Sequence, residues 1–291
     1  MRAKPDILCI GAAHWDVIGR SLAAISPGAD LPGTISTRPG GVALNVAQAV
    51  MQHGMRSGLL SVIGRDSDGE ALVAWLVAQG VETQHLHRPN NQSTDRYLAV
   101  EGPQGLGVAI ADSRALEGHS AALLAPLTDH ALRDWRGPVL VDSGLAPATL
   151  ASLARTGLPQ ARPLHVTSAA PAKADRLRPF LESGAVFAVN RQEAQALLDV
   201  PLTDSGMAAR ALLDAGARRA IVTDGPGPVT DADHAQTISE TPPAVCVQRV
   251  TGAGDNFLAA HMAAEWRGLD RRAALAYALE AAARHITTQE L

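Results

Sequence analysis

The sequence predicts an α/β fold, in which a central and mostly parallel β-sheet is flanked by helices on both faces. Short apolar runs typical of strands alternate with Ala/Leu-rich helical stretches about every 30 residues, which is the pattern of βαβ units. The strand-like runs are apolar throughout, as in DILCIGAA at residues 6–13, and this favours strands covered on both sides. The 291 residues are ~2 times the usual length of one domain, so we expect one large domain, alone or with a small appendage.

Each element follows from its local pattern. The predicted strands are short apolar runs, in chain order Ile7–Ala12, Gly58–Ile63, Val139–Asp142, Leu164–Thr167, Val186–Val189 and Ala220–Thr223. The predicted helices are Val42–His53, Gly69–Gln79, Ala146–Arg155, Gln192–Leu198, Met207–Ala215, Asp255–Trp266 and Arg271–Thr287.

Two stretches break this alternation. Pro32–Pro39 is short, β-branched and bounded by Pro and Gly, and Asp95–Asp112 has the pattern of a hairpin with a turn around Glu101–Gly105. They predict a small extended appendage, which could act as a lid. An ordinary edge hairpin explains the same pattern equally well.

The composition excludes several classes of protein. With 46% apolar, 19% charged and 3% aromatic residues, the chain is typical of a globular protein. Its net charge of -4 shows no basic excess, so we expect no nucleic-acid partner. Cys9 and Cys246 form no CxxC pair, which argues against a disulfide framework and favours a reducing compartment. No apolar run approaches the length of a membrane span, so we expect a cytoplasmic protein with no membrane partner.

The strongest local motif is TGAGD at Thr251–Asp255, which opens an apolar-periodic helix. The glycines Gly252 and Gly254 allow a tight turn whose N–H groups, with the helix dipole, can hold an anion. Asp255 would sit beside that anion, where it could accept a proton from a hydroxyl. Taken alone, the motif is also explained as a simple helix cap.

A second glycine pair precedes the helix predicted at residues 42–53. In RPGGVALNVA, Gly40 and Gly41 permit close approach of a ligand to the backbone, and Asn45 lies about one turn into the helix. A surface turn with a solvated Asn is the competing interpretation.

Three further motifs follow predicted strands. Asp16 lies just past the first strand, where a carboxylate can accept hydrogen bonds from two sugar hydroxyls. Asn190 and Glu193 offer oxygen ligands suited to Mg²⁺ through water, although their spacing also fits a capping box. In VTDGPG at Val222–Gly227, a strand ends in a Gly-rich turn that can contact a nucleotide, or it is only a hairpin turn.

Several common motifs are absent from the sequence. GxxxxGK[ST], HExxH and GxSxG do not occur, and no GxGxxG follows the first strand. A P-loop nucleotide site, a zinc protease, a hydrolase elbow and a Rossmann dinucleotide site are therefore not expected.

The order of these motifs resembles the ribokinase/PfkB family of sugar and nucleoside kinases. The resemblance covers essentially the whole chain and includes VIGRDSDGEAL at Val62–Leu72. It implies one ribokinase-like domain over residues 1–291, with a central sheet, flanking helices and a small β-sheet lid formed by insertions at about 17–39 and 93–112. ATP and Mg²⁺ are the implied cofactors, a monovalent cation is compatible with the resemblance, and the implied partners are ATP and a small sugar or nucleoside.

The resemblance also implies roles for individual residues. Asp255 would be the catalytic base, and Gly252, Ala253 and Gly254 would form the anion hole. The remaining roles are acceptor binding by Asp16, Gly40, Gly41 and Asn45, Mg²⁺ organisation by Asn190 and Glu193, and ATP contact by Asn190, Thr223, Gly225, Gly227, Gly252 and Gly254.

Within the family, Ser93–Ser113 and Val166–Leu177 resemble segments of bacterial pseudouridine kinases. That resemblance implies transfer of the ATP γ-phosphoryl group to the primary hydroxyl of pseudouridine. Candidates for contact with the base are Thr94, Arg96 and Lys173, although a solvated surface lysine is the alternative for Lys173. A kinase for another sugar or nucleoside, and a non-catalytic sugar or nucleotide sensor, are the competing functions.

The extended segments have apolar alternation but little core of their own, so one of their faces needs a partner. We expect that face to cover the acceptor site, and a homodimer formed through the lids is a further expectation.

Overall fold

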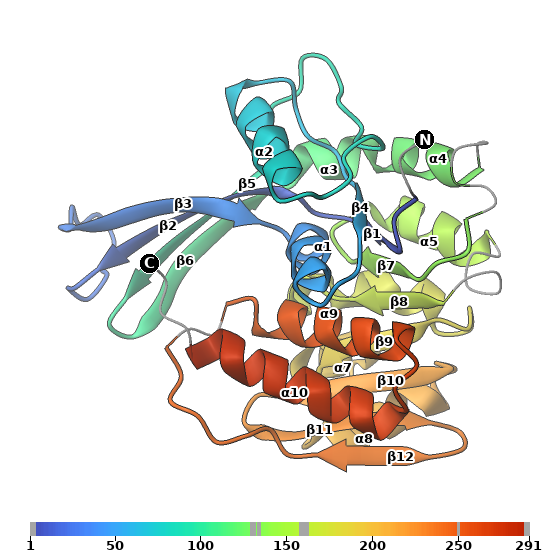
Figure 1. Cartoon of the computed structure of the whole chain (residues 1–291). Helices are drawn as coiled ribbons and strands as arrows, with labels where there is room; N and C mark the ends of the chain where they lie inside the picture. Colours follow the sequence, from blue (N-terminus) through green and yellow to red (C-terminus); the bar gives the residue numbers. More distant parts are fainter. Residues whose placement is uncertain (1–3, 129–131, 133–134, 157–162, 249–250, 288–291) are drawn as a thin grey trace.

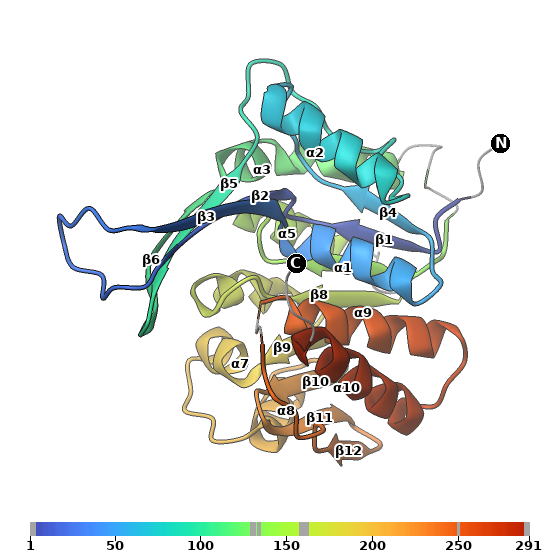
Figure 2. The ribbon, with the colours of Figure 1, turned by 60° about the vertical axis from the view of Figure 1, so that its left-hand side comes forward.

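The protein, described here from a computed structural model, contains two β-sheets (Figure 1). The structure describes residues 4–128, 132, 135–156, 163–248 and 251–287. The large sheet has eight strands in the order β12-β11-β10-β9-β8-β7-β1-β4, and the small sheet has four in the order β3-β2-β5-β6. The small sheet extends away from the body that surrounds the large one (Figure 2).

The large sheet is mostly parallel. Strands β4, β1, β7, β8, β9 and β10 pair in parallel, whereas β11 and β12 are antiparallel additions at one edge. Parallel strands bring their carboxyl ends to one edge of a sheet, which is where ligands bind in open α/β folds. The strand bounds are β1 Ile7–Ile10, β4 Ser57–Leu60, β7 Val139–Asp142, β8 Leu164–Thr167, β9 Val186–Asn190, β10 Arg219–Asp224, β11 Gly227–Asp233 and β12 Thr237–Glu240.

Helices cover both faces of this sheet because the inner strands are apolar on both sides. Ile7 and Cys9 of β1 pack against the helices on one face of the sheet, and Leu8 and Ile10 pack against the helices on the other face. The first group comprises α1 (Val42–Gln52), α2 (Ser67–Ala78), α9 (Ala253–Trp266) and α10 (Arg271–Thr287). The second comprises α3 (Arg114–His119), η1 (Ser120–Leu124), α4 (Ala125–Thr128), α5 (Pro147–Arg155), η2 (Pro171–Phe180), α7 (Arg191–Leu198) and α8 (Ser205–Asp214).

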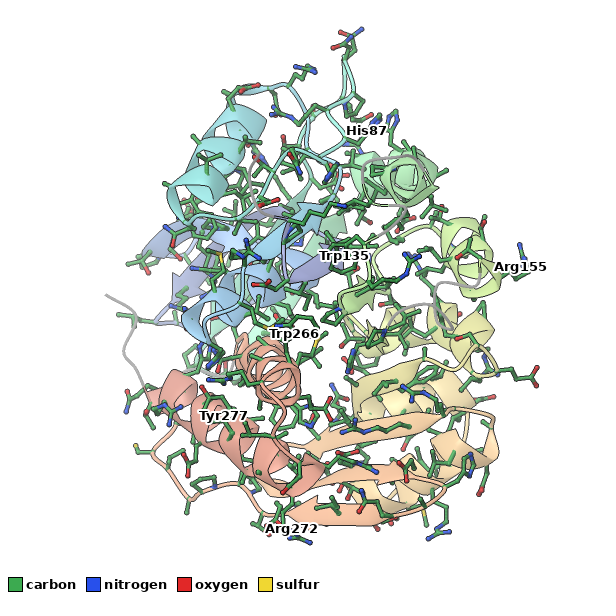
Figure 3. The ribbon with its side chains drawn as sticks, turned by 45° about the vertical axis from the view of Figure 1, so that its right-hand side comes forward. His87, Trp135, Arg155, Trp266, Arg272 and Tyr277 are labelled. Carbon is green, nitrogen blue, oxygen red and sulfur yellow. The ribbon has the colours of Figure 1, made fainter. Side chains whose placement is uncertain are left out.

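Side chains fill the layers between the sheet and its helices (Figure 3). Trp135 is 6% exposed and its indole N–H donates to the carbonyl of Pro5, whereas Arg155 and Arg272 lie at the periphery. Within the described residues, no helix is both long enough and apolar enough to cross a membrane.

The small sheet consists of β2 (His14–Ser21), β3 (Gly33–Gly40), β5 (Arg96–Gly102) and β6 (Gly105–Asp112). The hairpin predicted at Asp95–Asp112 is confirmed as β5 and β6, and the extended segment at Pro32–Pro39 is confirmed as β3. The sequence did not predict β2 as a strand. It pairs with β3 and with β5, so it joins the two predicted segments into one sheet.

The apolar face of the small sheet is exposed in the single chain. Ile35, Leu98, Val108 and Ile110 share one face by their register and are between 43% and 78% exposed. Asp16 projects from the opposite face, because side chains alternate along a strand. Asp16 lines the cavity described below, so the apolar side chains point away from the face that carries this residue, whereas we expected the apolar face to cover the acceptor site.

Candidate active site

Helix α9 begins at the glycine motif predicted from the sequence. Gly252 is its N-cap, with φ 78° in the left-handed region, and no side chain caps the helix. A Cβ built on Gly254 would meet nothing within 4 Å, so the space beside the first turn is open. The N–H groups of this turn are therefore free to face an anion, and the helix dipole adds positive potential there.

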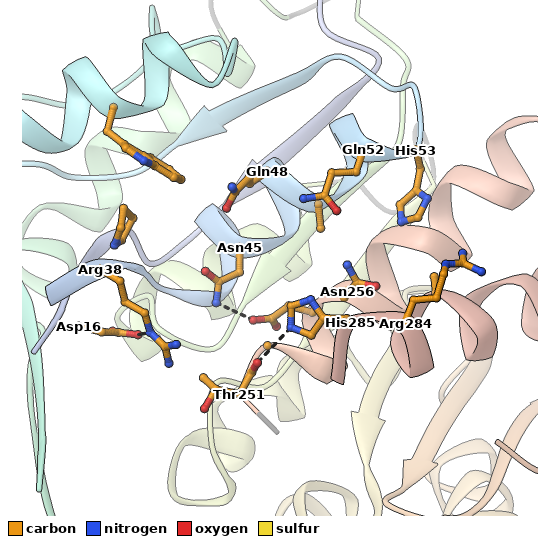
Figure 4. Close-up of a pocket in the computed structure, with 16 residues that line it drawn as sticks. Asp16, Arg38, Asn45, Gln48, Gln52, His53, Thr251, Asn256, Arg284 and His285 are labelled. Atoms are coloured by element: carbon orange, nitrogen blue, oxygen red, sulfur yellow. Dashed lines mark hydrogen bonds and ion pairs between the residues drawn. The ribbon is translucent and has the colours of Figure 1, made fainter. Parts of the chain in front are cut away.

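The structure joins this motif to the second glycine motif. The Asn45 side-chain amide, on α1, donates a hydrogen bond to Asp255 Oδ2 at 2.8 Å, although the residues are 210 positions apart (Figure 4). Burial raises the pKa of Asp255 to about 7, and the nearby Asp142 and Asp16 also raise it, against the lowering effect of the Asn45 amide. A carboxyl with this pKa can exchange a proton near neutral pH.

Asp16 lies on strand β2 rather than in a loop, and it is 9% exposed. Its carboxylate is 3.2 Å from His14 Nδ1 and 3.7 Å from Arg38 Nε, so two basic side chains hold it at the mouth of the site. A Cβ on Gly40 would lie 2.3 Å from Asp16 Oδ1, so this position needs glycine to admit the carboxylate.

Gly41 precedes α1 with φ 100°, a conformation that favours glycine. A Cβ at this position would lie 2.4 Å from the carbonyl oxygen of Ala12. Gly41 thus lets the start of α1 lie against the backbone that follows β1.

Two cavities meet at Asp255. One, of about 540 Å³, lies between the small sheet, α1 and α10, and the other, of about 330 Å³, lies over the carboxyl ends of β8, β9 and β10. The residues common to both are Asn45, Thr251, Gly252 and Asp255. Asp16 and Arg38 line the first cavity, and Asn190, Glu193 and Thr223 line the second. Asp255 can therefore contact ligands bound on either side of it.

Asn190 and Glu193 form the capping box at the start of α7. Asn190 Oδ1 accepts the backbone N–H of Glu193 at 2.9 Å, and Glu193 Oε2 accepts the N–H of Asn190 at 2.9 Å. Burial and, to a smaller extent, the neighbouring Asp255 raise the pKa of Glu193 to about 7, against the lowering effect of its hydrogen bonds with Asn190. A buried acid beside a second acid fits a divalent cation, with one carboxylate oxygen of Glu193 left outside the capping bond. In the described part of the chain, no cluster of three or more His, Cys, Asp or Glu side chains could enclose a metal by itself.

The predicted nucleotide turn is a hairpin in the structure. Strands β10 and β11 are antiparallel, and Gly225 takes φ 55° in the turn between them. Thr223 lines the second cavity, whereas Gly225 is exposed beyond it.

The three candidates for base contact lie outside both cavities. Thr94 donates its hydroxyl to Asp66 at 2.5 Å and helps to anchor the start of α2. Arg96 pairs with Asp68 of α2. Lys173 has a side chain 22% exposed, with its ammonium 3.5 Å from Ser113 Oγ and 3.8 Å from Glu117 Oε1.

Sequence reasoning missed three residues at this site. Asp142, at the end of β7, is fully buried and accepts the N–H groups of Ala12, Ala43 and Gly144. It ties β1, β7 and the start of α1 together, and a carboxylate at the end of an apolar strand was the available signal. Arg38 and His285 also line the first cavity, but no local pattern marks either of them.

Comparisons with known proteins agree with this geometry. The model of the pfkB family of carbohydrate kinases matches residues 4–291. Pseudouridine kinase of Escherichia coli is 28% identical over 265 residues, which cover 89% of this chain and 83% of that protein. Guanosine-inosine kinase of Exiguobacterium acetylicum is 27% identical over 98% of this chain and 95% of its own length.

A solved structure shares the fold. Ribokinase from Thermotoga maritima superposes with a TM-score of 0.85, at 20% identity, over 99% of this chain and 94% of the ribokinase. The family match, the kinase relatives and this likeness identify an ATP-dependent kinase that acts on a sugar hydroxyl. The chain belongs to the pfkB family of carbohydrate kinases.

Proposed function

We propose that this kinase transfers the γ-phosphoryl group of ATP to the primary hydroxyl of pseudouridine, giving pseudouridine 5′-phosphate. The observation that carries the reaction is the Asn45–Asp255 hydrogen bond in the wall between two cavities. The choice of acceptor rests on the likeness to the pseudouridine kinase of E. coli. We infer that the enzyme works in the cytoplasm, where ATP is available.

Asp255 acts as the base in this mechanism. It accepts the proton of the acceptor hydroxyl while the hydroxyl oxygen forms a bond to the γ-phosphorus and the bond from that phosphorus to the bridging oxygen of ADP breaks. The raised pKa of Asp255 makes the carboxylate a stronger proton acceptor than an ordinary aspartate. The Asn45 amide keeps the carboxylate in one orientation.

The start of α9 binds the transferring phosphoryl group. Backbone N–H groups of Gly252, Ala253 and Gly254 belong to the first turn of α9, with open space beside Gly254, and we propose that they stabilise negative charge as it spreads over the phosphoryl oxygens. Mg²⁺ held through water by Asn190 and Glu193 would neutralise phosphate charge in the adjoining cavity. Thr223 lines this second cavity, and the hairpin turn that holds Gly225 and Gly227 follows it, so we propose that these residues contact the nucleotide.

The acceptor binds against the small sheet in this proposal. Asp16 accepts hydrogen bonds from two sugar hydroxyls. Gly40 and Gly41 allow the backbone before α1 to approach the acceptor closely, and Asn45 lines the same cavity. The small sheet acts as a lid that excludes water, so that ATP is not lost to hydrolysis.

Lys173 is the candidate for contact with the base. Its ammonium lies 3.5 Å from the hydroxyl of Ser113, which follows the last strand of the small sheet. Burial raises the pKa of Asp142, and the positive charge of Lys173 partly offsets that rise. Asp142 in turn accepts an N–H group at the start of α1. The hydroxyl of Thr94 and the guanidinium of Arg96 are engaged with α2, so we propose no direct contact from either in this arrangement.

A panel of acceptors tests the proposal. ADP release is measured with pseudouridine, uridine, guanosine, inosine and ribose, and we expect the highest kcat/KM with pseudouridine. Guanosine and inosine belong in the panel because of the likeness to guanosine-inosine kinase. A preference for ribose or for a purine nucleoside would overturn the pseudouridine assignment and leave the kinase itself in place.

A second experiment tests Lys173. Lys173→Met removes one charged hydrogen bond, so KM for pseudouridine should rise about 10- to 150-fold while KM for ATP stays nearly the same. Lys4→Met is the matched control, because Lys4 is the chain's only other lysine and is exposed. An unchanged KM for pseudouridine would remove Lys173 from the site.

The apolar face of the small sheet supports a homodimer. Four large apolar side chains, Ile35, Leu98, Val108 and Ile110, are exposed together on one face, which is costly in water. We propose that a second copy of the lid covers this face, so that the two lids pack against each other.

A further inference from the structure

The last turn of α10 lies beside the loop that leads into α9 (Figure 4). Two hydrogen bonds between described residues join them. The backbone N–H of Gln248 donates to the carbonyl of Ile286 at 2.8 Å, and the His285 Nε2 atom lies 3.1 Å from the carbonyl oxygen of Thr251. Helix α10 therefore holds the loop that precedes the proposed anion-binding glycines.

Gly252, the described residue at the end of this loop, offers no side chain to hold it. Gly252 has no side chain and takes the left-handed conformation, and no side chain caps α9. A Cβ on Gly252 would lie 3.2 Å from His285 Nε2, so the imidazole packs directly against the glycine backbone. The imidazole thus contacts both the residue that precedes the anion site and the first residue of the site.

We propose that His285 is a positioning residue for phosphoryl transfer, which donates a hydrogen bond from Nε2–H to the Thr251 carbonyl and thereby sets the place of the anion-binding turn. A carbonyl oxygen can only accept a hydrogen bond, so Nε2 must carry the proton in this contact. The turn that His285 holds also begins the helix that carries Asp255, three residues beyond Gly252. A shift of this turn would move the N–H groups and the base relative to both ligands.

We expect the stability of the fold to depend little on this contact. Helices α9 and α10 pack through an apolar cluster that includes Phe257, Ala260, Leu275, Ala278 and Leu279. His285 lies outside that cluster, at a partly exposed position. Loss of its hydrogen bond should therefore change turnover and leave the melting temperature nearly unchanged.

The test compares two substitutions with a matched control. His285→Leu removes the donor, His285→Gln keeps an N–H donor on a side chain of similar reach, and His234→Leu removes an exposed histidine from the turn between β11 and β12. Each protein is assayed for kcat, for KM of both substrates and for Tm. The acceptor is whichever compound wild type phosphorylates best, so failure of the pseudouridine assignment would not affect the result.

We expect kcat of His285→Leu to fall roughly 10-fold, since small misplacements at a reacting centre cost that much or more. Both KM values should change little, His285→Gln should recover most of the turnover, and His234→Leu should match wild type. Wild-type kcat in the Leu variant would overturn the proposal. So would an equal loss in the Gln variant, a loss explained by a lower Tm, or a rise in KM for ATP at constant kcat.

Discussion

At the scale of the residue, Asp255 combines two properties that a base for hydroxyl deprotonation needs. Its carboxylate is fixed by the Asn45 amide at 2.8 Å, and its pKa is raised to about 7 by burial and by two neighbouring acids. The first property sets its direction, and the second makes the ionised form a better proton acceptor. Both come from contacts that span most of the chain.

Substitution of Asp255 by Asn keeps the size of the side chain and removes the proton acceptor. We expect kcat to fall by at least ~100-fold, the usual range for a general base, while calorimetry still detects binding of ATP. Because the pKa of Asp255 is raised from 3.8 to about 7 in the folded state, the fold loses stability as pH rises between these values, and the full loss remains at pH 8. The Tm of Asp255→Asn at pH 8 should therefore not fall, and wild-type turnover in this variant would exclude the role.

The dependence of kcat/KM on pH should show the ionisation of Asp255. A base must be deprotonated to act, so activity should decline as pH falls below the pKa of about 7. The Asn45 amide lowers this pKa, so Asn45→Ala should move the acidic limb of the profile to higher pH. Ionisation of ATP is common to both proteins and cannot cause the shift. A limb that stays in place, or moves to lower pH, would contradict the assignment.

At the scale of the element, the start of α9 contains a glycine, Gly254, that the packing of the fold does not require. Glycines elsewhere in the site have a structural reason, as at Gly41, where a Cβ would meet the Ala12 carbonyl at 2.4 Å. Gly254 has no such reason, because a Cβ there would meet nothing within 4 Å. The empty space beside it is where the proposed mechanism places the phosphoryl group.

Gly254→Val should therefore leave the fold intact and impair turnover, since its side chain would occupy the space of the anion. Circular dichroism and Tm report the fold, and ADP release reports turnover. Gly118→Val is a matched control, because Gly118 is also a helical glycine with open space around its Cβ position. If Gly254→Val has normal kinetics, the TGAGD motif is only a helix cap.

At the scale of the whole molecule, the two faces of the small sheet have different surroundings. The face with Asp16 and Arg38 lines a cavity of its own chain, whereas the face with Leu98, Val108 and Ile110 is exposed in the single chain. Burial of apolar area is the main favourable term in association, so a second chain is the expected cover.

A charge on the exposed face should prevent this association. We expect wild type to have the mass of a dimer by light scattering coupled to gel filtration, and Ile110→Glu to have that of a monomer. Leu22→Glu is the control, because Leu22 is 95% exposed and lies in the loop after β2, outside this face. If wild type has the mass of a monomer both at the concentration of the assay and at micromolar concentration, it does not form a dimer through the lid.

Much of the fold was predictable because its signals are local. Continuous apolar runs predicted β7 and β8 with their observed bounds, and the helical period predicted α10 over Arg271–Thr287. Glycines before a helix predicted the start of α1 at Val42, whereas α9 begins at Ala253 and was predicted from Asp255. Such patterns depend on neighbours within about one turn or a few residues of a strand, so the chain displays them before it folds.

Strand β2 and the site's partners could not be predicted in this way. HWDVIGRS carries Asp16 and Arg20 on one face, so it lacks the apolar pattern of a strand and forms one only between β3 and β5. Which face of the small sheet turns to the cavity also depends on how that sheet joins the body, which no local pattern records.

The sequence by itself determined the fold class, the order of the motifs and the chemical groups available for catalysis. Only the tertiary structure decided which of those groups meet. It brought the Asn45 amide within 2.8 Å of Asp255 and placed Asp142 near Asp255, with its carboxylate bonded to the start of α1. It also engaged Thr94 with Asp66 and Arg96 with Asp68, at the start of α2. The physical reason is that residue type and local period are properties of adjacent positions, whereas contact, burial and a raised pKa arise from segments that folding brings together from distant parts of the chain.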